Sequence, residues 1–264
     1  MGIELFQVDA FTDTPFLGNP AGVCILPEPK KDSWMQLVAR EMNVSETAFL
    51  LREGEGYRLR WFTPKVEVDL CGHATLASAH ILYEKGLLRK EEEARFQTRS
   101  GLLTARLKTS WVVLNFPAEP ATASEAPPDL LKALGVTAKY VGRNRLDYLV
   151  EVDSERTVRE LKPDIPLLAK VATRGVMVTS LSRSGDYDFV SRFFAPRVGV
   201  DEDPVTGSAH CCLGPFWRDR LHREELTAFQ ASERGGLLKV GTIGDRVTLS
   251  GHAVTVLKGE LVTP

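Results

Sequence analysis

Residues 60–69, RWFTPKVEVD, return almost unchanged as RFFAPRVGVD at residues 192–201. Six of the ten positions are identical, and the offset of 132 residues is half of the 264-residue chain. Each copy is soon followed by a glycine, Gly72 or Gly207, that begins a helix-like run. The segments FQTRSGLL (96–103) and FQASERGGLL (229–238) match again in the same order. This period is too long for a solenoid, whose repeats span tens of residues, so it predicts two related domains.

The stretch at 117–128, PAEPATASEAPP, separates the two halves, and its four prolines without a large apolar residue are typical of a linker. We therefore expect an N-terminal domain at 1–118, a linker at 119–128 and a C-terminal domain at 129–264. The last strand is a candidate to return to the first domain.

Strand patterns outnumber helical ones, and each half holds one long helical run, at 72–85 or 207–221, before a β-hairpin. The sequence thus predicts an α+β protein of two pseudo-symmetric β-rich domains, each a sheet or barrel wrapped around a central helix. A cleft between such domains is a natural active site.

Composition excludes several functional classes. The net charge is −2 without a basic stripe, which argues against a nucleic-acid partner. No apolar run approaches the ~18 residues of a membrane span, and the first residues do not resemble a signal peptide. The four cysteines form no CxxC pair, which is typical of a reduced compartment. We therefore expect a cytoplasmic protein.

The repeated glycines, Gly72 and Gly207, each mark a junction between a loop and a helix. The backbone N–H groups and the positive dipole end of a helix N-terminus bind anions well. A glycine in that place can also be a simple tight-turn residue, but the duplication favours anion binding. The expected ligand is a small carboxylate.

The second copy has three extra residues before its glycine, since EDPVT (202–206) stands where the first copy has Leu70 and Cys71. This insertion brings two carboxylates, including that of Asp203, and the hydroxyl of Thr206 to the start of the helix. Ser208 adds a second hydroxyl there. Thr206 has two open interpretations, as a ligand contact or as the N-cap of the helix.

Sequence motifs for metals and cofactors are missing. His80 lies too far along the helix from His73 to share a metal with it, and there is no HExxH or CxxC spacing. Neither a Walker A sequence nor GxGxxG occurs, so we expect no metal and no cofactor. Glu46 precedes an apolar strand and would ordinarily be exposed. A carboxyl group in a closed apolar cleft, however, has a raised pKa suited to general acid/base catalysis.

Four segments together resemble the PhzF family of phenazine biosynthesis-like proteins, which share the diaminopimelate epimerase fold. They are FTDTPFLGNPAGV (11–23), VSETAFL (44–50), CGHAT (71–75) and FAPRVGVDEDPVTGSAH (194–210). The resemblance implies a cofactor-independent isomerase, usually a homodimer, with its site between two pseudo-symmetric domains.

The resemblance also implies roles for individual residues. Glu46 matches the general acid/base that moves a proton between carbons of a dihydro-hydroxyanthranilate-type substrate. His73 and Asp203 match polar residues that flank this proton. The remaining positions match residues that receive the substrate carboxylate or lie near the cleft: Gly72, Gly207, Ser208 and Asn19.

Two departures leave alternatives open. Ala74 stands where phenazine-producing members often have proline, so the substrate can differ. Cys71 precedes Gly72 as in two-cysteine epimerases, although no second cysteine stands opposite it. The alternatives are therefore a cysteine-dependent amino-acid epimerase or racemase, and a non-catalytic protein that binds small carboxylates.

Overall fold

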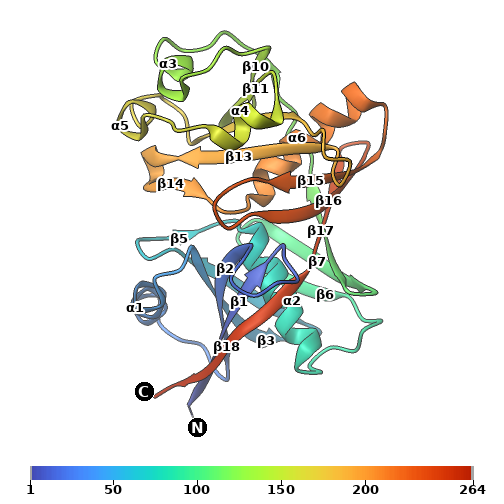
Figure 1. Ribbon diagram of the computed structural model, residues 1–264. Coiled ribbons are helices and arrows are strands. Elements are labelled where there is room, and N and C mark those ends of the chain that lie inside the picture. Colours follow the sequence, from blue (N-terminus) through green and yellow to red (C-terminus); the bar gives the residue numbers. More distant parts are fainter. Residues whose placement is uncertain (1, 263–264) are drawn as a thin grey trace. The chain divides into compact units, whose positions relative to one another are not determined.

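The computed structural model describes residues 2–262, which divide into two compact units (Figure 1). Unit 1 comprises residues 2–116 and 250–262, and unit 2 comprises residues 117–249. None of the helices within residues 2–262 has the length and apolar character needed to cross a membrane.

Unit 1 contains two helices and the strands around them. In chain order its elements are β1 (Ile3–Ala10), β2 (Asn19–Leu26), α1 (Asp32–Met42), β3 (Glu46–Glu53), β4 (Gly56–Phe62), β5 (Glu67–Val68), α2 (Gly72–Glu84), β6 (Ala94–Thr98), β7 (Gly101–Lys108), β8 (Trp111–Pro117) and β18 (Ala253–Leu261).

Unit 2 contains one long helix, several short ones and a second set of strands. Its elements are β9 (Thr122–Ala123), α3 (Leu130–Leu134), β10 (Tyr140–Arg143), β11 (Asp147–Glu151), α4 (Glu155–Glu160), α5 (Ile165–Leu168), β12 (Gly175–Leu181), β13 (Phe189–Ala195), the 3₁₀ helix η1 (Pro196–Val198), β14 (Val200–Asp203), α6 (Gly207–Leu221), β15 (Glu225–Gln230), β16 (Gly236–Ile243) and β17 (Arg246–Gly251).

The two units repeat one strand topology. In unit 1, β2 runs parallel to β3, β3 is antiparallel to β4, and β4 is antiparallel to β5 but parallel to β6. In unit 2, β11, β12, β13, β14 and β15 are paired in the same order and with the same directions. The internal sequence repeat therefore corresponds to a repeated chain path.

Helix α2 is the central helix of unit 1. It packs against β1, β2, β3, β7 and β18, and every residue from His73 to Ala79 is buried. A helix that is apolar all round belongs in a core rather than on a surface. In unit 2, α6 packs against β15 and β16, and its residues Ala209–Trp217 are buried.

The repeated arginine forms the same ion pair in both units. Arg60 on β4 donates from Nε and Nη2 to the two carboxylate oxygens of Glu67, at 2.7 Å each. Arg192 on β13 donates in the same way to Glu202, at 2.7 and 2.8 Å. Such bidentate pairs fix both geometry and register. Each pair ties its strand to the short strand that leads into the long helix.

These ion pairs show where the three extra residues of the second copy lie. Val68 stands opposite Trp61 and Asp203 opposite Phe193, so the extra residues precede Glu202. Our expectation that they are part of 202–206 is wrong, because Glu202 is the counterpart of Glu67. The chain accommodates them in η1 and the turn after it, where Gly199 has a φ of 88°.

The third matching segment is also displaced by one residue. Tyr57 pairs with Phe96, whereas its counterpart Phe189 pairs with Ala228 rather than Phe229. Phe96 and Ala228 are both fully buried. A shift of one residue moves a side chain to the other face of a strand. The sequence alignment of Phe96 with Phe229 is therefore wrong in register.

Unit 2 does not begin and end at the boundaries that the sequence predicts for the C-terminal domain. Residues 119–128, which the sequence presents as a linker, form part of unit 2, since β9 pairs with β10 there. Strand β18 pairs antiparallel with β1 along its length and belongs to unit 1 (Figure 1, red beside blue).

Replacing Arg192 with methionine should destabilise the protein. Its guanidinium also donates to the carbonyls of Val158 and Leu161, so the substitution leaves these acceptors and Glu202 without their donor. We expect a loss of about 2–3 kcal/mol in the free energy of unfolding, measured by urea denaturation.

The matched control is Arg156→Met, which breaks the exposed pair of Arg156 with Glu160. Such surface pairs contribute only about 0.5 kcal/mol. Equal losses in the two variants would contradict the structural role of Arg192.

Candidate functional site

Three chain segments of unit 1 begin close together and carry the predicted site residues. Asn19 is the first residue of β2, Glu46 is the first of β3, and Gly72 and His73 begin α2. Strands β2 and β3 are parallel, with Ala21 paired to Glu46, and α2 packs against both. The start of each element therefore presents its side chains to the same part of the unit.

His73 lies at the centre of this group. Its Nε2 atom is 3.2 Å from Oε2 of Glu46, and its Nδ1 atom is 3.3 Å from the amide nitrogen of Asn19. The hydroxyl of Ser45 donates to the amide oxygen of Asn19 at 3.0 Å, which orients the amide nitrogen toward the ring. With Nδ1 as the acceptor, the proton of a neutral imidazole lies on Nε2, the atom that faces Glu46.

Burial sets the charge of this histidine. His73 is 5% exposed, and the loss of solvation lowers its pKa from 6.5 to about 3. The imidazole is therefore neutral near neutral pH, since burial disfavours the charged form. A neutral ring beside Glu46 can donate a hydrogen bond without adding a positive charge.

Cys71 completes the cluster from the N-cap position of α2. Its sulfur lies 3.5 Å from Nδ1 of His73. Ligand atoms of Glu46, Cys71 and His73 all lie within 4.8 Å of one another, so the three could hold a metal ion. Sequence motifs could not indicate this group, because Glu46 is 25 residues from Cys71.

The start of α2 keeps its capacity to bind an anion. The side chain of Cys71 makes no capping hydrogen bond, and the first turn contains no acidic residue. An uncapped helix start offers backbone N–H donors together with the positive end of the dipole.

In unit 2, α6 begins at Gly207 with Thr206 at the N-cap position, but the Thr206 hydroxyl makes no capping bond. It donates instead to Oδ2 of Asp203 at 2.6 Å. Gln230 fixes this turn, because its amide accepts from the backbone N–H of Thr206 at 2.9 Å and donates to the carbonyl of Asp203 at 2.7 Å. The Thr206 side chain is therefore a partner of Asp203 and not a helix cap.

Ser208 is held by a charged pair that the sequence analysis did not identify. Nη2 of Arg174 donates to the Ser208 hydroxyl at 3.0 Å. The same guanidinium forms a bidentate ion pair with Asp147, whose carboxylate is fully buried. No local pattern predicts this contact, since Asp147 begins β11 and Arg174 directly precedes β12.

The predicted residues thus form two groups, one in each unit. Unit 1 assembles Asn19, Glu46, Cys71 and His73 around the start of α2, and unit 2 assembles Asp203 and Ser208 around the start of α6 at Gly207. That both groups serve one substrate stays a prediction of the sequence.

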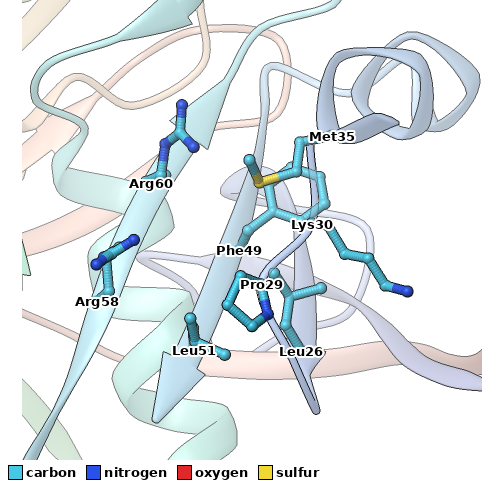
Figure 2. A pocket seen from close by; sticks show the side chains of 8 residues that line it. All are labelled: Leu26, Pro29, Lys30, Met35, Phe49, Leu51, Arg58 and Arg60. Atoms are coloured by element: carbon cyan, nitrogen blue, oxygen red, sulfur yellow. The ribbon is translucent and has the colours of Figure 1, made fainter. Parts of the chain in front are cut away.

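A separate small cavity in unit 1 has a volume of about 30 Å³ (Figure 2). Its lining combines apolar and basic side chains: Leu26, Pro29, Lys30, Met35, Phe49, Leu51, Arg58 and Arg60. Its cations are already in ion pairs, Lys30 with Glu28, Arg58 with Glu53 and Arg60 with Glu67. None of these lining residues belongs to the candidate site, so the cavity is separate from it.

Acid should destabilise the protein through His73. The unfolded chain binds a proton at this histidine with a pKa of 6.5, whereas the folded chain binds it only near 3, so stability falls as pH falls between these values. Between about pH 7 and about pH 5 we expect this group to remove about 2 kcal/mol.

Replacing His73 with glutamine should remove this part of the pH dependence. The measurement is the free energy of unfolding of both proteins by urea denaturation at the two pH values. An equally steep loss of stability in the variant would contradict a buried neutral His73.

Comparison with known proteins identifies the family of this chain. The family model of the phenazine biosynthesis-like proteins, PhzC-PhzF, matches residues 8–259. A protein of Halalkalibacterium halodurans named as an uncharacterized isomerase is 56% identical over 263 residues, which are 99% of each chain.

Solved structures show the same fold. A PhzF-family protein of Enterococcus faecalis has a TM-score of 0.96 and 39% identity, and covers 100% of both chains. A probable proline racemase of Agrobacterium radiobacter K84 has a TM-score of 0.66 at 13% identity, covering 99% of this chain and 93% of its own, and shares the fold alone. These likenesses confirm the expected α+β, epimerase-like fold. The chain belongs to the phenazine biosynthesis-like, or PhzC-PhzF, family.

Proposed function

We propose that this protein is a cofactor-independent isomerase that moves a proton on a small carboxylate-bearing substrate, with Glu46 as general acid/base. The coarser statement, an isomerase of the phenazine biosynthesis-like family, rests on the family match and on relatives named as isomerases. The observation that carries the finer proposal is the pairing of Glu46 with a buried, neutral His73.

In the proposed reaction, the Glu46 carboxylate takes a proton from a carbon that is alpha or vinylogous to the substrate carboxylate. The electron pair of the broken C–H bond enters the conjugated system. The protonated Glu46 then returns the proton to another carbon, so no electrons are gained or lost. His73 assists because its neutral ring can donate a hydrogen bond to the charge that develops.

The residues of unit 2 supply contacts suited to the substrate carboxylate. Because the Ser208 hydroxyl accepts a hydrogen bond from Arg174, its own proton can be donated to an anion. The uncapped start of α6 at Gly207 adds backbone donors. Asp203 faces Thr206, and we assign it, with His73, to the polar groups around the transferred proton.

Replacing Glu46 with glutamine tests the proposal. A glutamine amide keeps the shape of the side chain but cannot accept the proton. We expect the incorporation of deuterium from D₂O into a dihydro-hydroxyanthranilate substrate to fall by at least about 100-fold, with binding roughly retained. Mass spectrometry measures the incorporation.

The matched control is Glu53→Gln, at the opposite end of β3, where the carboxylate pairs with Arg58 on a half-exposed surface. This variant should exchange deuterium like the wild type. Unchanged exchange in the Glu46 variant would refute the role of Glu46, and tight binding without exchange in the wild type would indicate a non-catalytic carboxylate-binding protein.

A thiol-based epimerase is the second candidate, because the Cys71 sulfur contacts His73. It would lose activity in Cys71→Ala and keep it in Glu46→Gln. A second thiolate is unfavourable, since burial raises the pKa of Cys24, Cys211 and Cys212 to about 12. The unfavourable ionisation of these three thiols favours Glu46, rather than a pair of thiols, as the acid/base. We further propose that the protein is cytoplasmic and forms a homodimer. Light scattering would test the oligomeric state.

A further inference from the structure

We infer that Glu46, Cys71 and His73 form a binding site for a soft divalent cation of the zinc class. The three side chains offer a carboxylate, a thiol sulfur and an imidazole nitrogen within 4.8 Å of one another. Two of them belong to the proposed proton-transfer group, so an ion bound there would act as an inhibitor. The binding itself does not depend on the proposed function; the inhibition does.

Two of the observed spacings are those of neighbouring ligand atoms around a tetrahedral zinc ion, although they involve different nitrogens of the His73 ring. Bond lengths of about 2.3 Å to sulfur and about 2.0–2.1 Å to nitrogen or oxygen place neighbouring ligand atoms about 3.3–3.6 Å apart. The sulfur of Cys71 lies 3.5 Å from Nδ1 of His73, and Oε2 of Glu46 lies 3.2 Å from Nε2. A single ion binds only one ring nitrogen. The donor on the other side of the ring must therefore move closer to the ion.

His73 provides independent support. Its Nε2 atom is buried and, within residues 2–262, has no hydrogen-bond partner, because its approach to Glu46 is close but not aligned as a hydrogen bond. A buried polar atom without such a partner is costly, and metal coordination is one way to satisfy it. Coordination through Nε2 requires the neutral ring to carry its proton on Nδ1 instead.

The donor set selects the ion. Sulfur and imidazole favour zinc or cobalt over magnesium and calcium, which prefer oxygen. On binding, the sulfur–metal bond replaces the S–H bond of Cys71, and its proton passes to the solvent. The thiolate and the Glu46 carboxylate together balance the charge of a divalent ion. Three protein ligands leave a fourth position for water, as in open zinc sites.

Titration of the apoprotein with Co²⁺ tests this site without any substrate. We expect one ion per chain, with a near-ultraviolet thiolate-to-cobalt charge-transfer band and the visible bands of tetrahedral cobalt. Addition of Zn²⁺ should displace the cobalt and abolish the bands. Cys71→Ser should lose the charge-transfer band, and Glu46→Gln should keep it while binding cobalt at least about tenfold more weakly.

The control variant is Cys24→Ala, which removes a buried thiol elsewhere in unit 1 and should leave the cobalt spectrum unchanged. Circular dichroism checks that each variant is folded. If Cys71→Ser is not folded, the weaker cobalt binding expected of Glu46→Gln tests the site instead. Absence of the charge-transfer band in the wild type, its persistence in Cys71→Ser or its loss in Cys24→Ala would overturn the inference. If cobalt binds as expected but Glu46→Gln retains deuterium exchange, the metal site stands and the proposed function fails.

Discussion

The bidentate pair between an arginine and a glutamate is the interaction on which both units depend. Arg60 holds Glu67 in unit 1 and Arg192 holds Glu202 in unit 2, each linking a core strand to a short strand. In both units the long helix begins five residues after that glutamate, at Gly72 or Gly207. The ion pair therefore sets where the helix starts, and with it the position of the side chains in the first turn. The guanidinium also lies over an aromatic ring two residues along its strand, Phe62 or Phe194, which adds a cation–π contact.

The same scaffold supports different chemistry because the residue after each glycine differs. In unit 1 this residue is His73, a buried neutral ring between Glu46 and Asn19. In unit 2 it is Ser208, a hydroxyl held by the Arg174 guanidinium. A neutral imidazole beside a carboxylate suits proton transfer, whereas a hydroxyl beside an arginine suits an anion. In the proposed function, the repeat thus provides the geometry, and the difference between His73 and Ser208 divides the roles.

The repeat also shows how far sequence reasoning extends. The matching residues of the repeat located the two helix starts correctly, because a glycine after a repeated strand pattern is a local signal. The same matching misplaced the extra residues near Glu202 and the counterpart of Phe96 in unit 2. Strand register is decided by pairing across the sheet and not by the identity of the residues. The linker assignment at 119–128 failed for a similar reason: β9 pairs with β10, and no composition rule reveals such a partner.

By itself the sequence determined the duplicated α+β architecture, the two helix starts and the candidates Glu46, His73, Asp203 and Ser208. These follow from local patterns and from a specific family resemblance. Only the tertiary structure decided the environment of each candidate: the Ser45 and Asn19 hydrogen bonds that orient His73, the buried Asp147 behind Arg174, and the closeness of Cys71 to the Glu46 pair. The physical reason is that charge state and donor geometry depend on burial and on partners distant in the chain, which spacing along the sequence does not contain.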